Sequence, residues 1–422
     1  MSLLRLLRIL VGTNAHPYVM PQRERIGVLM NSTAETTLTP PHANTPEMGE
    51  LSPYQAGPVL TQATLAHNGI ALEWLDGQKT TLPLLWLRDH CACPACRHPQ
   101  TRERLYLPLE PITEPPSVAL LDGHLHLQWQ DGHVSAFHSG WLYQRRPEAE
   151  LTSAVPNAKP WVDNFTPEHI SHSDFLTPLG EKAWLTAMLR DGLALITDGP
   201  LVEEEVSRLA ERIGPLRATN FGARFDVRSK PNPNNAAYTA VGLPLHIDLP
   251  NWRQPPDIQL LYCLQNGASG GESLFADGAR VVEALRQESP EALTILSETP
   301  IDFRFQDETH DISMRAPVIT LDSAGNLVEM RLNNWIRDAL HLPVEQMDAW
   351  YSAYALLWKL FHSEAHQLEF TLRPGQMVAF DNRRVLHGRR EFDPNSGARH
   401  LQGTYLDRDM LASRLRVLAR NV

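Results

Sequence analysis

The sequence predicts an α+β protein, mainly β, that is built from two domains. Its 422 residues exceed what one hydrophobic core usually organises. Short strand-like runs bounded by Gly and Pro recur along the chain, and helical periodicity appears between them. The 33 prolines favour many loops and turns. Together these observations predict a small β-rich domain over residues 57–150, a larger domain over residues 160–422, and a tail over residues 1–56.

The tail is expected to be disordered or to precede the true start of the protein, with Met30 as a candidate start. Arg5 and Arg8 interrupt its opening apolar run, and no small-residue cleavage site follows, so a secretory signal fits poorly and a transit peptide stays open. No stretch approaches the roughly 18 apolar residues of a membrane span. We therefore expect a soluble, cytoplasmic protein with no membrane partner.

Both predicted domains contain recognisable elements. In the first, the alternating runs LHLQWQ and HVSAF indicate strands, and a polar, proline-marked linker follows. In the second, Gly192 and Gly214 stand where the first two helices would be capped. Helices are predicted at residues 179–190, 202–213, 281–286, 290–297, 344–365 and 410–419. Strands are predicted at residues 258–264, 318–321, 327–331, 368–372 and 376–380.

Composition and charge narrow the class of partner. Hydrophobic residues make up 42% of the chain and charged residues 21%, which is typical of a globular protein. The formal net charge of -11 provides no basic field for a phosphate backbone, so nucleic acid is not expected as a partner. A small-molecule ligand fits this balance better.

Three of the 4 cysteines, Cys91, Cys93 and Cys96, crowd into the short segment CACPAC. So few cysteines cannot form a disulfide framework, and this spacing is typical of thiolates that share one tetrahedral Zn(II) in a reducing compartment. A redox switch is the alternative. The fourth cysteine, Cys263, lies in the apolar run IQLLYCLQ and is expected to be a buried core residue.

The fourth zinc ligand stays open on spacing alone, because several histidines lie nearby. The candidates are His90, His98, His124, His126, His133 and His138. Three thiolates and one histidine would form a closed site, which leaves no position for water or substrate. Such a site is expected to stabilise the fold rather than to catalyse a reaction.

A second metal-binding pattern lies in the larger domain. His246 and Asp248 are two positions apart in the segment LPLHIDLP, and the two-residue period of a strand would place both side chains on one face. His387, in the segment MVAFDNRRVLHGRREF, could complete the set. Two histidines and one carboxylate leave positions open on Fe(II) for 2-oxoglutarate and dioxygen, whereas zinc of the carbonic-anhydrase type prefers three histidines. An exposed strand end is the alternative for the His-x-Asp pair.

Arg399, in the segment SGARHLQGTY, follows these candidate ligands. Its planar guanidinium can hold the distal carboxylate of 2-oxoglutarate through two parallel hydrogen bonds, which a lysine cannot reproduce. The neighbouring Arg383, Arg384, Arg389 and Arg390 are expected to be solvated or structural, and the alternative is that one or two of them serve substrate or cofactor.

These motifs resemble those of the gamma-butyrobetaine and trimethyllysine dioxygenase family of 2-oxoglutarate oxygenases. The resemblance covers about residues 65–420 and rests on HID, FDNRRVLHGRR and ARHLQGTYLDRD, with NNAAYT, GGES and RLNN in the expected order. It implies a double-stranded β-helix, a distorted jelly roll whose opposing sheets would bring His387 to His246 and Asp248. It also implies Fe(II), 2-oxoglutarate as co-substrate, ascorbate as reductant, and a homodimer.

The resemblance assigns roles to further residues. It selects His133, in DGHVSAF, as the fourth zinc ligand. It places Asn235 and Asn333 at the substrate carboxylate or at 2-oxoglutarate, and Ser273 at 2-oxoglutarate. A trimethylammonium group cannot donate hydrogen bonds, so aromatic faces surround it. The corresponding cage positions, for which filling of the core is the alternative, are Phe221, Phe225, Tyr238 and Tyr405.

The predicted reaction is hydroxylation of gamma-butyrobetaine to L-carnitine, with oxidative decarboxylation of 2-oxoglutarate to succinate and carbon dioxide. Leu249 follows Asp248 where some family members have a substrate-binding tyrosine, and two cage positions are phenylalanine. These departures keep open an oxygenase of the same fold that acts on trimethyllysine or another small amine or betaine. An alternative of another class is a non-catalytic binding protein organised by zinc.

Overall fold

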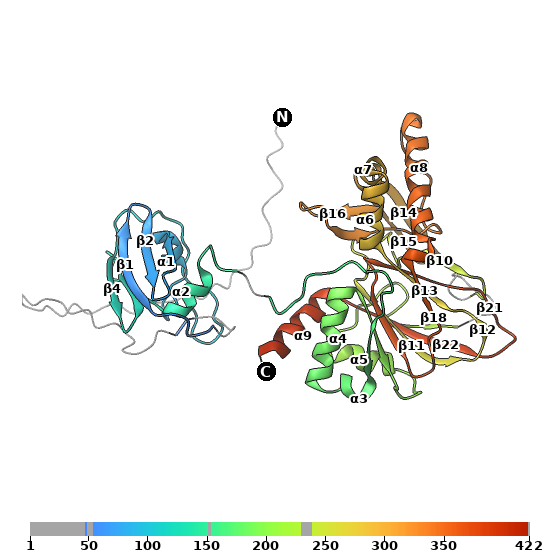
Figure 1. The fold of residues 1–422 in the computed structure, drawn as a ribbon, viewed down its shortest axis with the longest axis horizontal. Coiled ribbons are helices and arrows are strands. Elements are labelled where there is room, and N and C mark those ends of the chain that lie inside the picture. The colour runs from blue at the N-terminus through green and yellow to red at the C-terminus, as the bar shows by residue number, and fades with distance from the viewer. Residues whose placement is uncertain (1–46, 49–53, 151–152, 229–238, 421–422) are drawn as a thin grey trace, which may run out of the picture. The chain divides into compact units, whose positions relative to one another are not determined.

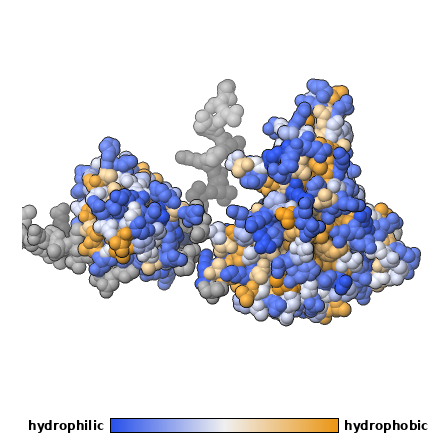
Figure 2. Space-filling view, viewed as in Figure 1, coloured by the Kyte–Doolittle hydropathy of each residue, from blue (hydrophilic) through white to orange (hydrophobic). Residues whose placement is uncertain are grey.

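The computed structural model describes residues 47–48, 54–150, 153–228 and 239–420 (Figure 1). The chain divides into two compact units, Met1–Ala149 and Glu150–Val422. Among the described residues, no helix is long and apolar enough to cross a membrane. On the face drawn in Figure 2, both units mix hydrophilic with apolar residues. The predicted tail, apart from a few residues at its end, and the predicted site residues Asn235 and Tyr238 lie outside the described residues.

The first unit contains two antiparallel sheets of three strands each, with the orders β1-β2-β3 and β4-β5-β6. The runs LHLQWQ and HVSAF form β5 and β6, as predicted. One shared core includes Trp74, Leu125, Phe137 and Trp141, all almost completely buried. The elements are β1 (Leu60–Ala66), β2 (Gly69–Trp74), β3 (Lys79–Leu82), α1 (Leu84–Asp89), β4 (Ser117–Leu121), β5 (His124–Gln128), β6 (Val134–Phe137) and α2 (Ser139–Arg145).

The second unit is built around two larger sheets, with the orders β10-β20-β13-β18 and β7-β8-β19-β11-β22-β9. Their strands are β7 (Glu168–Ser171), β8 (Leu193–Thr197), β9 (Arg224–Val227), β10 (Leu243–His246), β11 (Ile258–Asn266), β13 (Ser273–Asp277), β18 (Gln367–Phe370), β19 (Met377–Asp381), β20 (Val385–Arg389) and β22 (Arg399–Leu406). Three pairs of short strands complete the unit: β12 (Ser269–Gly270) with β21 (Phe392–Asp393), β14 (Ile301–Gln306) with β15 (Asp311–Ala316), and β16 (Ile319–Leu321) with β17 (Leu327–Met330). The helices are α3 (His172–Phe175), α4 (Pro178–Asp191), α5 (Glu205–Glu211), α6 (Gly278–Glu288), α7 (Pro290–Glu298), α8 (Val344–Phe361), the 3-10 turn η2 (Glu364–His366) and α9 (Arg408–Arg420).

The two larger sheets share one apolar core. Phe275 of β13 and Val385 of β20 come from the four-stranded sheet, and they cluster with Leu195 of β8, Val378 of β19 and Leu401 of β22 from the six-stranded sheet. Because successive side chains of a strand point to opposite faces, the remaining apolar residues of these strands face outward. The strands are therefore apolar on both faces, unlike strands with one solvated face.

Helices cover both outward faces (Figure 1). Residues of α4, α5 and α9 bury the outer face of the six-stranded sheet, in a cluster that includes Trp184, Leu209 and Leu415. Residues of α6, α7 and α8 bury the four-stranded sheet, in a cluster that includes Val282 and Trp350. The mainly β prediction is confirmed, and the order of layers is helix, sheet, sheet, helix. The double-stranded β-helix topology stays a prediction.

Several element boundaries differ from the prediction. Gly192 caps α4 with a φ of 74°, as predicted, because glycine adopts the left-handed region without a steric penalty. The next helix, α5, is shorter than predicted: it begins after Glu204, whose φ is 71°, and ends before Arg212, so Gly214 is not its cap. Helix α8 ends at Phe361, because the backbone turns to an extended conformation at Ser363 before a separate 3-10 turn.

Candidate iron and zinc sites

The structure brings His246, Asp248 and His387 together in the second unit. His246 ends β10 and pairs directly with His387 of β20 in the antiparallel register. Their ring centroids are 4.3 Å apart. Asp248 Oδ1 lies 3.5 Å from His246 Nε2 and 3.7 Å from His387 Nε2. One ligand atom from each residue lies within 4.8 Å of the other two, a spacing at which all three can reach a single ion.

The prediction that His246 and Asp248 lie on the same face of one strand is wrong. Strand β10 ends at His246, and Asp248 lies in a bend beyond it rather than on the same strand face. Asn382 fixes this bend: its Oδ1 accepts a hydrogen bond of 2.7 Å from the Asp248 backbone N–H, and its Nδ2 donates one of 3.0 Å to the Asp248 carbonyl. Asn382 is fully buried. Its two hydrogen bonds, rather than the geometry of a strand, therefore hold the Asp248 backbone in place.

Hydrogen bonds outside the triad orient its ligands. His246 Nδ1 donates to the carbonyl of Pro244 at 2.9 Å, which leaves the Nε2 lone pair directed at Asp248. The Tyr405 hydroxyl donates to Asp248 Oδ2 at 2.7 Å and leaves Oδ1 facing both imidazoles. Such support is typical of metal ligands, because it fixes the tautomer and the ring orientation before the ion binds.

The protonation states also suit a cation. Burial and the neighbouring His246 lower the pKa of His387 to about 3, so its imidazole is neutral at neutral pH. Burial alone would raise the pKa of Asp248, but the two histidines and the Tyr405 hydroxyl hold it below its ordinary value. Two imidazoles and one carboxylate on one side of an ion form the ligand set typical of non-haem Fe(II) oxygenases.

A cavity of about 330 Å³ lies beside the triad, within the size range of small-molecule sites. Six predicted residues outside the triad line it: Phe221, Phe225, Ser273, Asn333, Arg399 and Tyr405. Its other lining residues are Val227, Leu243, Leu249, Asn251, Gln259, Leu261, Phe275, Phe305, Trp335, Ile336, Gly388, Arg389 and Leu401. The lining is mainly apolar, with a few polar groups at defined places.

Arg399, at the start of β22, is the polar group that most clearly points to an anionic ligand. Among the described residues, its buried Nε and Nη1 have no hydrogen-bond acceptor. Burial lowers the pKa of Arg399, which reflects the cost of an unpaired buried cation. A carboxylate that enters the cavity would supply the missing acceptors. The orphaned guanidinium and the ligand triad therefore fit both 2-oxoglutarate and iron.

Among the four neighbouring arginines, Arg389 lies at the site, in line with the alternative that one or two of them contact substrate or cofactor. It is buried and lines the cavity, and burial followed by the nearby Arg399 lowers its pKa to about 10. Its Nη2 also donates to the carbonyls of Thr239 and Val241, at 3.1 Å for Val241. Arg384, by contrast, is structural as expected, because it is buried and binds Asp277.

An aromatic wall extends from the triad. The rings of Phe225 and Tyr405 are 5.2 Å apart, and Phe221 packs edge-on against Phe305 at 5.8 Å. Trp335 stands perpendicular to His246 at 4.8 Å. Phe305 and Trp335 were missed, because Phe305 comes from the β14–β15 hairpin and carries no motif. Trp335 directly follows RLNN and could have been suspected from that position.

Two polar cavity residues were also missed. Asn251 and Gln259 each present a buried side-chain carbonyl oxygen with no donor among the described residues. Asn251 is oriented by a hydrogen bond of 3.1 Å from its Nδ2 to the carbonyl of Ile312. Gln259 lies opposite Tyr405 in the β11–β22 register. Their oxygens add partial negative charge to a pocket with an aromatic wall, which favours a cation.

The second ligand cluster lies in the first unit and consists of Cys91, Cys93, Cys96 and His133. His133 Nε2 is 3.2, 3.7 and 3.5 Å from the three sulfur atoms in that order. Zinc–sulfur bonds of about 2.3 Å and zinc–nitrogen bonds of about 2.0 Å in a tetrahedron would separate sulfur from nitrogen by about 3.5 Å. The donor set and its spacing therefore fit Zn(II).

Local structure positions these zinc ligands. Cys96 and Arg97 both donate backbone N–H groups to the Cys93 carbonyl at 2.9 Å, which closes a tight turn around the thiolates. In the β5–β6 turn, Asp131 Oδ1 accepts from the His133 backbone N–H at 2.9 Å. Arg88 Nη1 donates to Cys96 Sγ at 3.0 Å and helps to offset the charge of the thiolate.

Comparison with known proteins shows the family to which the chain belongs. The model of the taurine catabolism dioxygenase TauD, TfdA family matches residues 157–405, and that of the gamma-butyrobetaine hydroxylase-like N-terminal family matches residues 62–143. Gamma-butyrobetaine dioxygenase of Pseudomonas sp. (strain AK-1) is 40% identical over 372 residues, which cover 86% of this chain and 97% of that protein. Trimethyllysine dioxygenase of Rattus norvegicus is 29% identical over 349 residues, which cover 79% and 82% of the two chains.

Among solved structures, the non-heme iron oxygenase OrfP in complex with Fe and alpha-ketoglutaric acid is similar with a TM-score of 0.45 and 16% identity, over 58% of this chain and 95% of that one. The fold class, the ligand triad and the family matches together define a 2-oxoglutarate-dependent dioxygenase. Within this class, the chain belongs to the TauD, TfdA family and, at 40% identity, to the gamma-butyrobetaine dioxygenases, as its motifs predicted.

Proposed function

We propose that this dioxygenase converts gamma-butyrobetaine, 2-oxoglutarate and dioxygen into L-carnitine, succinate and carbon dioxide. The observation that carries the proposal is one cavity, lined by the ligand triad, in which Arg399 and Tyr405 lie at opposite ends of β22 and so define a cationic end and an aromatic end. Arg389 and Arg399 supply the positive charge, and Phe221, Phe225 and Tyr405 belong to the aromatic wall.

Each end suits one reactant. In the proposed complex, Arg399 binds the distal carboxylate of 2-oxoglutarate through its unpaired N–H groups, with Ser273 nearby. The aromatic wall surrounds the trimethylammonium group, which can be held only by ring faces and other partial negative charge. Asn333 lines the cavity and is expected to contact the substrate carboxylate, and Asn235 has the same expected role. Tyr238 is expected to complete the cage.

The two metals would have different roles, one catalytic and one structural. His246, Asp248 and His387 would hold Fe(II), which with 2-oxoglutarate activates dioxygen. The chain's own residues keep the substrate carbon close to that chemistry and exclude water from it, because the cavity is apolar along most of its lining. Cys91, Cys93, Cys96 and His133 would hold a structural Zn(II).

Several further properties belong to the same proposal. The two larger sheets, which share a core, would form a double-stranded β-helix, with His246 and His387 on neighbouring strands of the four-stranded sheet. The protein would work as a cytoplasmic homodimer, with ascorbate keeping iron reduced and with neither nucleic acid nor a membrane as partner. Three reduced thiolates at the zinc site favour a reducing compartment.

The test is the yield of succinate and hydroxylated product in the presence of Fe(II), 2-oxoglutarate and each of several amines. With gamma-butyrobetaine, we expect one L-carnitine for each succinate formed. Trimethyllysine is the leading alternative, because Leu249 stands where some family members have a substrate-binding tyrosine. Coupled turnover with trimethyllysine but not with gamma-butyrobetaine would replace the proposed substrate, and no 2-oxoglutarate turnover with any amine would contradict the proposed reaction.

A further inference from the structure

The loop that carries the candidate iron ligand Asp248 is held from one side by an extended segment. We call residues 247–253 the ligand loop. Two hydrogen bonds join segment 329–333 to the start of this loop. The Ile247 backbone N–H donates to the Leu332 carbonyl at 2.9 Å, and Asn333 Nδ2 donates to the Ile247 carbonyl at 3.1 Å. The start of the ligand loop is therefore fixed directly before Asp248.

Arg331, in the same segment, fixes the other end of the ligand loop. Its Nη1 donates to the carbonyls of Pro250 at 2.5 Å and Trp252 at 2.7 Å, and its Nη2 donates to the carbonyl of Arg253 at 3.0 Å. Its Nε binds Glu329. Arg331 is only 4% exposed, so water has little access to its guanidinium. Its hydrogen-bond acceptors are instead three loop carbonyls and one carboxylate.

Leu249, between the two held ends, has an unfavourable backbone conformation. Its φ is 57°, in the left-handed region that a leucine rarely adopts. Leu249 is buried and lines the cavity directly after Asp248. A strained residue at a ligand site persists only where surrounding contacts impose its conformation. The Leu249 carbonyl accepts from the Trp252 backbone N–H at 3.1 Å, and the contacts of Asn382 with Asp248 and of Arg331 with the end of the loop hold this turn from either side.

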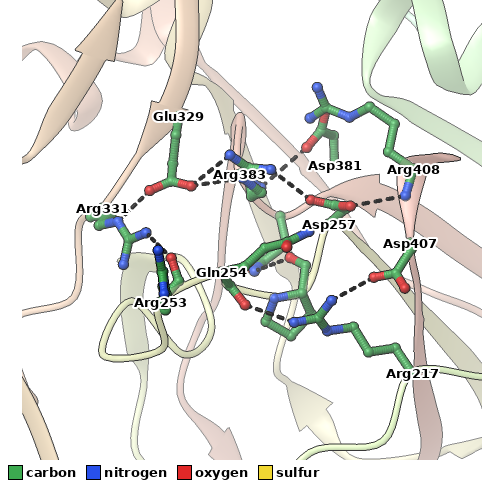
Figure 3. Close-up of polar contacts among 12 residues, drawn as sticks. Arg217, Arg253, Gln254, Asp257, Glu329, Arg331, Asp381, Arg383, Asp407 and Arg408 are labelled. Carbon is green, nitrogen blue, oxygen red and sulfur yellow. Dashed lines mark hydrogen bonds and ion pairs between the residues drawn. The ribbon is translucent and has the colours of Figure 1, made fainter. Parts of the chain in front are cut away.

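Arg331 belongs to a network of ion pairs (Figure 3), and a backbone hydrogen bond joins Asn382 to the same network. Glu329 binds Arg383 as well as Arg331, with 2.8 Å from Arg383 Nε. Arg383 Nη1 in turn binds Asp257 Oδ1 at 2.9 Å. The Asp257 backbone carbonyl accepts from the Asn382 N–H at 2.7 Å. The two sides of the ligand loop are thus joined through Glu329, Arg383 and Asp257.

We propose that Arg331 is a positioning residue for the metal: it imposes the left-handed conformation at Leu249 and thereby directs the Asp248 carboxylate toward His246 and His387. The inference rests on the proposed function only in taking the triad as a divalent metal site. It requires neither gamma-butyrobetaine nor any other particular substrate.

The test measures binding of Mn(II), a redox-stable stand-in for Fe(II), to the zinc-loaded full chain. Free Mn(II) is counted by electron paramagnetic resonance, without oxygen or substrate. Arg331→Lys keeps the charge but cannot reach three carbonyls and Glu329 together, and we expect the dissociation constant to rise about 10-fold or more, as for other residues that support metal ligands. Glu329→Gln should give a smaller rise, because it loosens Arg331 without removing it.

A double-mutant cycle separates positioning from general destabilisation. Asparagine tolerates the left-handed region better than leucine, so residue 249 should depend less on Arg331 in a Leu249→Asn background. In that background, Arg331→Lys should lower the Mn(II) affinity by only about 3-fold or less. The matched control is Arg414→Lys, which disturbs an ion pair to the buried Glu181 at 2.6 Å between α9 and α4. It should lower the melting temperature and leave Mn(II) affinity unchanged.

Three results would overturn the inference: wild-type Mn(II) affinity in Arg331→Lys, an equal loss in both backgrounds of the cycle, or the same loss in Arg414→Lys at an equal change in melting temperature. If the wild-type chain binds no Mn(II), the proposed function fails instead. The two failures are therefore distinguishable.

Discussion

Tyr405 and Asp248 join the substrate cavity to the metal site through one hydrogen bond. The Tyr405 hydroxyl donates to Asp248 Oδ2 at 2.7 Å, while the Tyr405 ring packs against Phe225 in the aromatic wall. The same side chain therefore contacts the region expected to hold the substrate cation and orients the carboxylate expected to hold iron. A change at Tyr405 should affect both sites, but by separable amounts.

We predict that Tyr405→Phe weakens iron binding more than substrate binding. The ring stays in the wall, but the carboxylate loses the donor that keeps Oδ1 directed at the two histidines. The Fe(II) concentration at half-maximal 2-oxoglutarate turnover should rise about 10-fold. A change confined to the half-saturating concentration of gamma-butyrobetaine would show that the hydroxyl serves substrate alone.

Arg399→Lys should weaken binding of 2-oxoglutarate. Lysine keeps the charge but cannot make two parallel hydrogen bonds, so the half-saturating 2-oxoglutarate concentration should rise by about 30-fold or more, the equivalent of at least about 2 kcal/mol. Initial rates at saturating Fe(II) provide the measurement. Arg390→Lys is the matched control, because Arg390 binds the exposed Glu369 outside the cavity. Equal effects in the two variants would contradict the role of Arg399.

The aromatic wall predicts that the cavity distinguishes a cationic ligand from a neutral ligand of the same shape. Replacement of the substrate nitrogen by carbon gives a neutral analogue of the same shape, which loses the attraction of a cation to ring faces. This attraction is worth about 0.5–2 kcal/mol, so the analogue should bind about 2- to 30-fold more weakly than gamma-butyrobetaine. Competition assays measure the ratio. Phe225→Leu should bring it closer to one, and an unchanged ratio would place the cation elsewhere.

Zinc removal should expose three thiols and leave one protected. Chelation would free Cys91, Cys93 and Cys96 and remove the metal proposed to stabilise the first unit. Cys263 lies fully buried in the second unit, and burial raises its pKa to about 12. Since the thiolate is the reactive form, a thiol with so high a pKa stays protonated and unreactive at neutral pH. Mass spectrometry after iodoacetamide treatment should find three of the 4 cysteines modified, and early modification of Cys263 would contradict this.

The three cysteines of the candidate zinc site were predictable from the sequence because CACPAC is a short, unusual motif. The other ligands carry weaker signals: spacing leaves the fourth zinc ligand open and only the resemblance selects His133, and the His-x-Asp pair is a common pattern until the distant His387 is added. Register then explains what the motifs alone could not. His246 and His387 are opposite one another in the β10–β20 ladder, so two distant segments deliver adjacent imidazoles.

Other parts of the site could not be predicted, because they depend on burial and tertiary contact. Arg389 stands in a run of arginines whose charges look alike in sequence, yet it lines the cavity while Arg390 is exposed. Phe305 reaches the site only because the β14–β15 hairpin folds against Phe221. Asp248 was placed on a strand because local alternation hides the bend that Asn382 imposes from a remote turn.

His246, Asp248 and His387 are proposed to bind one ferrous ion beside Arg399. Crystals prepared without oxygen in the presence of Fe(II) and 2-oxoglutarate, with diffraction measured on both sides of the iron absorption edge, test it directly. We predict one iron peak bonded to Nε2 of both histidines and to a carboxylate oxygen of Asp248, with a 2-oxoglutarate carboxylate on Arg399. Iron at another position, or a His387 ring turned away from it, would contradict the account.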